Sequence, residues 1–395
     1  MSFGDNQPTP DGASAADCRI REIRLNEDLK GVVQSWKECN SSFQDRSIHC
    51  DPDWIAQHFK RESKNVHIYL LEKGREILGA VPFALYEQPL LCRLGDSIVA
   101  KFPMRVLDLQ GFAPNLPASE TVYDMLFNQV LTSNFDAIHM SSLKTESFLW
   151  SYLHRSSLVR KSFRYYSRRG TSPHLLIQLD GSFDNYMKKF SAKTRKNRYR
   201  EIKLLRERRE VHLVRVSEAS QIDSFLDSSY AISRKTRQFD RFGWGIAGRD
   251  PEAVRDELQL LAQRGWLRSY LLLCGGTACS FILGHQYGSR FYPAAAGVDP
   301  AWSSFSAGTV ILLLVLKDLF AENSPECYDL GSYSQHKEHF ANESYPEASV
   351  WLFRRRPYSL MVSSVYQACN SASTKAATIL DHLNLKSRVK ELLWR

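Results

Sequence analysis

The stretch DPAWSSFSAGTVILLLVLKDLF, residues 299–320, decides the fold. Four small residues, Ser306, Ala307, Gly308 and Thr309, come directly before an apolar run that predicts a buried helix. Two interpretations of these small residues are open. Either Ser306 caps the helix by accepting hydrogen bonds from its first amides, or the small side chains leave those amides, and the positive end of the helix dipole, open to an anion.

Length and composition predict a folded protein of two or three domains. The chain has 395 residues, of which 43% are hydrophobic, so it can bury more than one core. The longest apolar run, VILLLVL, ends at Lys317, too early to span a membrane. Residues 1–17 lack the basic and apolar regions of a signal peptide and are predicted to be a disordered leader.

The eight cysteines indicate a reducing compartment. They are scattered along the chain with no CxxC pair and no zinc-type spacing, and their neighbours are apolar. We therefore expect buried thiols, no disulfide, no metal and a cytoplasmic protein, with peripheral attachment at the inner membrane face as a further expectation.

One segment carries almost all of the net charge. Residues 188–210 contain 11 Lys and Arg against 3 Glu, which is +8 of the total +9. Five of the cations follow spacings of 4, 3, 4 and 3, so they share one face of a helix. They are Lys189, Lys193, Lys196, Arg200 and Lys203. This face is either simply solvated or a clamp for phosphates, on a nucleotide-linked acceptor or on a carrier RNA.

The order of elements suggests an internal duplication. Each half reads as helices, a strand meander, a helix and a closing strand, which predicts two mixed α/β domains. The predicted ranges are 18–170 and 171–356, followed by C-terminal helices in 357–395. A single long helix is expected over Phe183–Arg209. The stretch 379–395 either docks on the second domain or lies on a membrane surface.

Polar residues gather after the strand that follows the apolar helix. The strand over 289–299 and the helix start after it suit a carrier with an amide arm and a pyrophosphate. The next strand, at 327–334, leads into a polar cluster. Its members are Asp329, Tyr333, Ser334, His336, Lys337, Glu338 and His339.

Three runs carry a family resemblance: FSAKTRKNRYREIKLLRER (190–208), SAGTVILLLVLKDLF (306–320) and CYDLGSYSQHKEHF (327–340). They resemble the GNAT-superfamily branch of CelD-type acetyltransferases of cellulose biosynthesis, which is similar to the Fem peptidoglycan aminoacyl transferases. The matches comprise a basic helix start, a small-residue helix opening and a late segment. They are Ser191, Lys193 and Arg195; Ser306 and Gly308; and Tyr328, Asp329, Gly331 and Lys337. Ala307 replaces the usual proline, and His336 stands where tyrosine is usual.

The resemblance implies an α/β protein with two tandem GNAT-like mixed-sheet domains. It implies an acyltransferase that moves an acyl group, expected to be acetyl, from acetyl-CoA or another acyl-CoA to an amine or hydroxyl. The acceptor would be a small molecule or a nucleotide- or lipid-linked sugar of surface polysaccharide synthesis. The alternatives are a Fem-like transferase that uses aminoacyl-tRNA, and a nucleic-acid-binding protein without catalysis.

The residue roles that follow are expectations. Ser306, Ala307, Gly308 and Thr309 would bind the pyrophosphate of the cofactor. Lys337, with Tyr333 and Asp329, would carry the chemistry, unless Lys337 is a surface residue paired with Glu338 or Glu343. The residues expected to bind the acceptor are Lys193, Arg195, Lys196, Arg198 and Arg200.

Overall fold

The structure is a computed structural model that forms two compact units. It describes residues 17–25, 27–43, 46–60, 65–95, 97–110, 114–322 and 324–382. The predicted leader, apart from its last residue, and most of the stretch 379–395 lie outside these residues. The first unit takes in residues up to Ser172 and from Pro346 on, and the second is Pro173–Tyr345.

The first unit is a mixed sheet with helices. Its strands, in sheet order, are β1 (Cys18–Arg24), β2 (Val66–Lys73), β3 (Glu76–Leu94), β4 (Ser97–Leu109), β5 (Ala137–Lys144) and β12 (Glu343–Arg354). All neighbours are antiparallel except β4 and β5. The helices are α1 (Glu27–Lys30), α2 (Val33–Ser42), α3 (Pro52–His58), α4 (Glu120–Leu131), α5 (Phe148–Arg155), α6 (Ser157–Ser162) and α14 (Pro357–His382), with a short 3₁₀ turn η2 (Ile48–Cys50).

The second unit repeats this plan. Its strands, in sheet order, are β7 (Val211–Val216), β8 (Ser269–Cys274), β9 (Thr277–Tyr287), β10 (Arg290–Val298), β11 (Cys327–Ser332) and β6 (Phe163–Gln178). Here β10 and β11 are the parallel pair. The helices are α7 (Phe183–Met187), α8 (Ala192–Arg208), α9 (Ile222–Arg234), α10 (Arg237–Phe242), α11 (Pro251–Gln263), α12 (Ala307–Glu322) and α13 (Gln335–Glu338), with η4 (Ala219–Gln221), η5 (Ile246–Gly248) and η6 (Pro300–Phe305).

The two strand orders are equivalent, which confirms the predicted duplicated α/β fold. Each unit has four antiparallel strands, a crossover helix, a parallel strand and an antiparallel closing strand. Each closing strand comes from a distant part of the chain. Strand β6 comes directly after the helices of the first unit and pairs with β11, while β12 follows the whole second unit and pairs with β5.

Three local predictions differ from the structure. The strands expected on either side of residue 170 are one strand, β6, so the division between the units falls inside it. The expected long helix is broken into α7 and α8. The break occurs because the Ser191 hydroxyl caps a new helix by accepting a hydrogen bond from the Thr194 amide at 3.2 Å. The predicted ranges also put residues 346–356 with the second half, whereas their contacts lie with the first unit.

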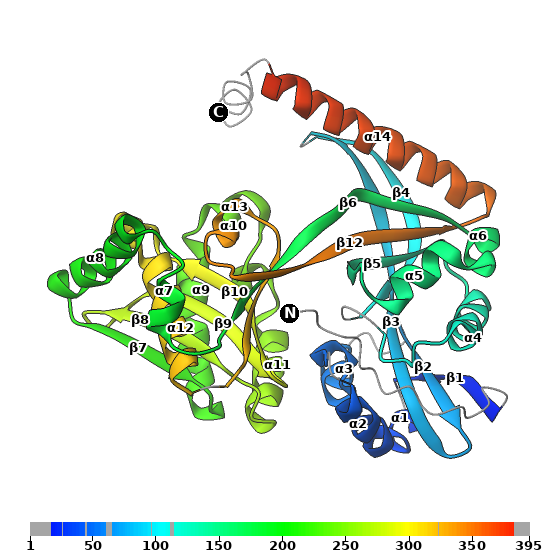
Figure 1. The fold of residues 1–395 in the computed structure, drawn as a ribbon, viewed down its shortest axis with the longest axis horizontal. Helices are drawn as coiled ribbons and strands as arrows, with labels where there is room; N and C mark the ends of the chain where they lie inside the picture. The colour runs from blue at the N-terminus through cyan, green and yellow to red at the C-terminus, as the bar shows by residue number, and fades with distance from the viewer. Residues whose placement is uncertain are drawn as a thin grey trace. The chain divides into compact units, whose positions relative to one another are not determined.

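The core of the second unit is built around α12 (Figure 1). This helix buries residues on most of its circumference, among them Val310, Leu313 and Leu316, each fully shielded from solvent. A helix apolar on nearly all sides must lie inside a domain rather than on its surface. Its position is therefore fixed by packing along its whole length.

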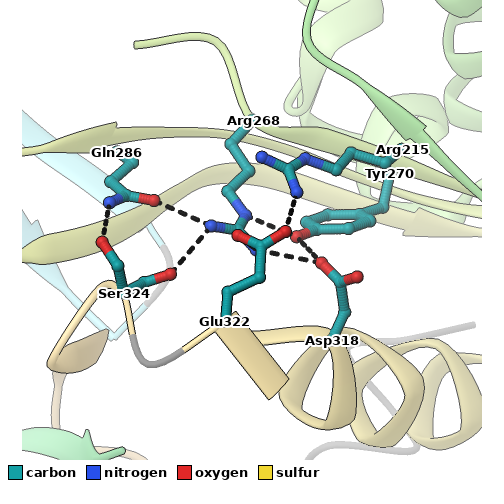
Figure 2. Close-up of polar contacts among 7 residues, drawn as sticks. All are labelled: Arg215, Arg268, Tyr270, Gln286, Asp318, Glu322 and Ser324. Atoms are coloured by element: carbon teal, nitrogen blue, oxygen red, sulfur yellow. Dashed lines mark hydrogen bonds and ion pairs between the residues drawn. The ribbon is translucent and has the colours of Figure 1, made fainter. Parts of the chain in front are cut away.

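Arg268 anchors the C-terminal end of α12 (Figure 2). Its guanidinium, only 2% exposed, lies 3.0 Å from Asp318 and 2.9 Å from Glu322 in the last turns of the helix. It also donates to the Tyr270 hydroxyl at 2.7 Å, and that hydroxyl donates to Asp318 at 2.7 Å. Burial opposes the charge, but these neighbours raise the pKa of Arg268 above its usual value. Arg215 pairs with Glu322 from the outer side.

We expect Arg268→Met to lower the free energy of unfolding by about 2–4 kcal/mol, because a buried network loses its central cation. The two carboxylates are about one-third exposed, so water compensates part of the loss. Chemical denaturation of the full chain measures this. Arg215→Met, which removes a 39% exposed partner of the same carboxylate, should cost less than about 1 kcal/mol. Equal losses would show that Arg268 does not anchor the helix.

Candidate functional site

The parallel strands β10 and β11 separate soon after they begin. Among the described residues they pair only at Arg290 with Cys327 and at Phe291 with Tyr328. Strand β10 goes on pairing with β9 as far as Val298, and β11 goes on pairing with β6. Beyond Phe291, one edge of β10 therefore has no strand partner in the described part of the chain. An extended ligand with amide groups can pair with such an edge.

The part of β10 with the free edge carries a bulge and two exposed alanines. The register shifts between Pro293 and Ala295, which marks a bulge, and Ala294 and Ala296 are exposed. Bulges re-aim a strand and are common beside functional sites. The short alanine side chains leave room for a ligand to approach the backbone.

The small residues singled out in the sequence lie at the start of α12, next to the end of β10. Ser306 adopts a left-handed conformation (φ 56°), and its carbonyl accepts hydrogen bonds from the amides of Thr309 at 2.9 Å and Val310 at 3.0 Å. Ala307 and Gly308 are the first residues of the helix, whose amides have no intrahelical acceptor. A side chain at Gly308 would come within 2.9 Å of Val298, so glycine here allows close packing of helix and strand.

The duplicated helix in the first unit gives an internal comparison. Helix α4 occupies the same position between parallel strands, but it carries Glu120 in its first turn. Helix α12 has no acidic residue in its first turn. A carboxylate at a helix start occupies the favourable potential and repels another anion. Of the two crossover helices, α12 is therefore the one suited to bind a phosphate group.

Asp329 holds the strands together at the point where β10 and β11 separate. Its carboxylate, 5% exposed, lies 2.8 Å from Nε2 of His174 on β6 and 3.4 Å from Arg290 on β10. It also accepts a 2.8 Å hydrogen bond from the amide of Gly331, whose positive φ of 76° suits glycine. Burial opposes the charge of Arg290, but Tyr292, Cys327 and Asp329 raise its pKa above the usual value. These contacts indicate a positioning role for Asp329.

Tyr333 and Lys337 follow the end of β11. The Lys337 ammonium donates to the carbonyl of Ser332 at 3.3 Å, and Lys337 belongs to the short helix α13, which Ser334 caps. The exposed Tyr333 hydroxyl donates to Glu338 at 2.9 Å, and this hydrogen bond raises the pKa of the phenol above its usual value. The Lys337 ammonium and the Tyr333 hydroxyl can both act as hydrogen-bond donors.

The basic face predicted on 188–210 is divided in the structure. Lys189 donates to the carbonyls of His339, at 3.1 Å, and Ala341, so it is tied to the backbone. Nη1 of Arg198 donates to both carboxylate oxygens of Glu201, and the guanidinium lies over the ring of Phe340. By contrast, the four other cations of the predicted face lie on α8 and are exposed. They are Lys193, Lys196, Arg200 and Lys203. Arg195, between the two faces of the helix, is half-buried.

Sequence reasoning missed His174 and Arg290. Both lie in segments that read as ordinary strands, and only the pairing of β6, β10 and β11 brings them to Asp329. Among the described residues, no three His, Cys, Asp or Glu side chains are grouped to hold a metal ion. In the same part of the chain, no helix is long and apolar enough to cross a membrane. All eight cysteines are free thiols.

Part of the second unit matches a known family model. Residues 192–341 match the family model of the acetyltransferase (GNAT) domain. No curated protein sequence matches the chain. Among solved structures, the crystal structure of FemX is similar with a TM-score of 0.58 at 10% identity, covering 88% of this chain and 100% of that one. A conserved protein of unknown function from Bacteroides thetaiotaomicron gives a TM-score of 0.52 at 10% identity, covering 85% and 99%.

The matched segment spans the free edge of β10, the start of α12 and the residues that follow β11. At 10% identity, the similarity to these solved structures is a similarity of fold alone. By fold, the chain is an α/β protein of two tandem GNAT-like mixed-sheet domains, and residues 192–341 of the second match the GNAT acetyltransferase domain by sequence.

Proposed function

We propose that the protein is an acyltransferase that takes an acyl group from coenzyme A at the separation of β10 and β11. The observation that carries the proposal is the combination of an unpaired strand edge with a helix start free of acidic residues. An acyl-CoA has an amide-containing arm and a pyrophosphate. The strand edge can pair with the amide arm, and the helix start can bind the pyrophosphate. The GNAT match over 192–341 supports the same donor.

The binding groups follow from this arrangement. The edge of β10 beyond Phe291 would pair with the amide arm, and the amides at the start of α12 would bind the pyrophosphate. Ser306 and Thr309 add hydroxyl groups beside those amides. The direction of the arm would bring the thioester toward the point where the strands part, near Asp329.

The chemistry is direct transfer. The amine or hydroxyl of the acceptor attacks the thioester carbonyl, and the C–S bond breaks. The acceptor gives up one proton and the leaving thiolate of coenzyme A takes up one, so the step balances. Lys337 would stabilise the developing negative charge or donate the proton, and Tyr333 is a second proton donor close by. Asp329 would keep the strands in place, because its carboxylate is already shared by His174, Arg290 and the Gly331 amide.

The acceptor is proposed to carry phosphate. The CelD-type resemblance favours a nucleotide- or lipid-linked sugar of surface polysaccharide synthesis. Lys193, Lys196 and Arg200 are exposed cations that could bind its phosphates, with Arg195 and Arg198 nearer the core. The second candidate is a Fem-like transferase that takes its acyl group from aminoacyl-tRNA. The overall similarity of fold to FemX keeps this candidate open.

Ser306→Asp should weaken acyl-CoA binding at least about tenfold, near 1.4 kcal/mol, because a carboxylate at the helix start repels the pyrophosphate. Aspartate tolerates the left-handed backbone of this position and suits a helix N-terminus, so the melting temperature should stay equal or rise. Calorimetric titration with acetyl-CoA and thermal melting provide the two measurements.

Ser306→Asn is the matched control, since it has the same shape and backbone tolerance without the charge. Its affinity for acetyl-CoA should stay within a few-fold of the wild type. If both variants bind equally well, the pyrophosphate does not lie at this helix. If the wild type binds aminoacyl-tRNA and not acetyl-CoA, the second candidate replaces the first.

Lys337→Met should lower turnover by about a hundredfold, with donor affinity and melting temperature nearly unchanged, because its charge is needed only in the transition state. Release of the coenzyme A thiol with a panel of sugar amines reports turnover. Lys317→Met removes an exposed lysine of α12 and is the control. Turnover within a few-fold of the wild type would make Lys337 a surface residue, and Tyr333→Phe the next variant to test.

A further inference from the structure

The outer side of α8 is a strongly cationic surface that the fold does not use. Six of its Lys and Arg side chains are exposed, and the one exposed acid of the helix is Glu207. The six are Lys193, Lys196, Arg200, Lys203, Arg206 and Arg208. The helix has 17 residues, so this surface is about 25 Å long.

The opposite side of α8 does the packing. Leu205 is fully buried and Ile202 packs against the core that surrounds α12, beside which α8 lies (Figure 1). Arg198 belongs to this inner side through Glu201 and Phe340. The outer cations therefore add nothing to the core.

The outer cations also oppose helix formation. Lys193, Lys196 and Arg200 succeed one another at spacings of three and four, where like charges repel. Of the outer cations, Lys203 has an acidic neighbour, Glu207, at 3.6 Å. An external anionic surface would relieve this repulsion, which gives the cationic surface a physical reason to exist.

Apolar side chains among these cations indicate what kind of anion fits. Tyr199 and Leu204 are each 42% exposed on the same helix. Tyr199 and Ile202 line a shallow hollow of about 340 Å³ whose other lining residues are Lys203, Arg206 and Glu207. Phosphates of a nucleic acid would bind the cations but offer nothing to Leu204. Lipid headgroups above acyl chains match both the cations and the apolar groups.

We propose that the outer face of α8 docks the protein on an anionic lipid bilayer, with the cations at the headgroups and Leu204 and Tyr199 at the boundary of the acyl chains. This docking stands on α8 alone and does not require the acyltransferase proposal. If both hold, a lipid-linked acceptor would be met at the same surface.

Vesicle flotation of the full-length protein tests the docking. We expect binding to vesicles of phosphatidylcholine mixed with phosphatidylglycerol and little binding to phosphatidylcholine alone. Lys193→Gln/Lys196→Gln/Arg200→Gln should lower the bound fraction at least about tenfold, and added salt should do the same, because the attraction is screened. Leu204→Ser should lower binding about threefold, including at high salt, where the apolar contact remains.

The matched control is Lys30→Gln/Arg75→Gln/Lys101→Gln, which removes three exposed cations elsewhere and gives the same net charge. It should bind like the wild type, and all variants should melt within a few degrees of it. Loss of binding in this control equal to that of the α8 variant would overturn the proposal. So would equal binding to both kinds of vesicle, binding unaffected by Leu204→Ser, or tight binding of tRNA with no binding to vesicles.

Discussion

The second unit depends on a parallel strand pair that is held at one end and open at the other. Two residue pairs join β10 to β11 among the described residues, and Asp329 fixes this short seam by binding groups from β6 and β10. Everything around the opening follows from that constraint. The bulge turns β10 away, the small residues let α12 approach it, and Arg268 holds the far end of the helix on the neighbouring strands. The opening therefore has the Asp329 cluster at one end and the Arg268 cluster at the other. Polar contacts are directional, so these two clusters define the geometry more closely than apolar packing alone would.

Much of this could be read from the sequence, because it rests on local patterns. The apolar run 310–316 predicts the buried helix, the paired glycines at 275 and 276 predict the β8–β9 turn, and the polar residues after 327 predict the end of β11. The duplicated order of strands and helices was also visible. These features depend on periodicity and turn chemistry within a few residues, which one sequence contains in full.

The rest depends on contacts between distant residues. Nothing in the sequence around His174 or Arg290 marks them as partners of Asp329, since 155 residues separate His174 from that carboxylate. The helix start at Ser191 is a local signal, because the family resemblance includes it, whereas the polar pattern alone predicted one continuous helix. The cations of 188–210 share one pattern, but burial divides them into Lys189 and Arg198, which bind the protein itself, and the outer set, which does not. Which side of a helix faces the core depends on contacts with elements that are distant in the sequence.

The exchange of closing strands between the two repeats sets an order on folding during synthesis. The ribosome makes β5 long before β12, which begins at Glu343. The first unit therefore lacks its closing strand while about two hundred further residues are made. The second sheet receives all its strands, from β6 to β11, in one uninterrupted stretch. The repeat translated later is thus the first able to close. Until β12 is made, β5 presents an unpaired edge, which is a site where another strand can pair.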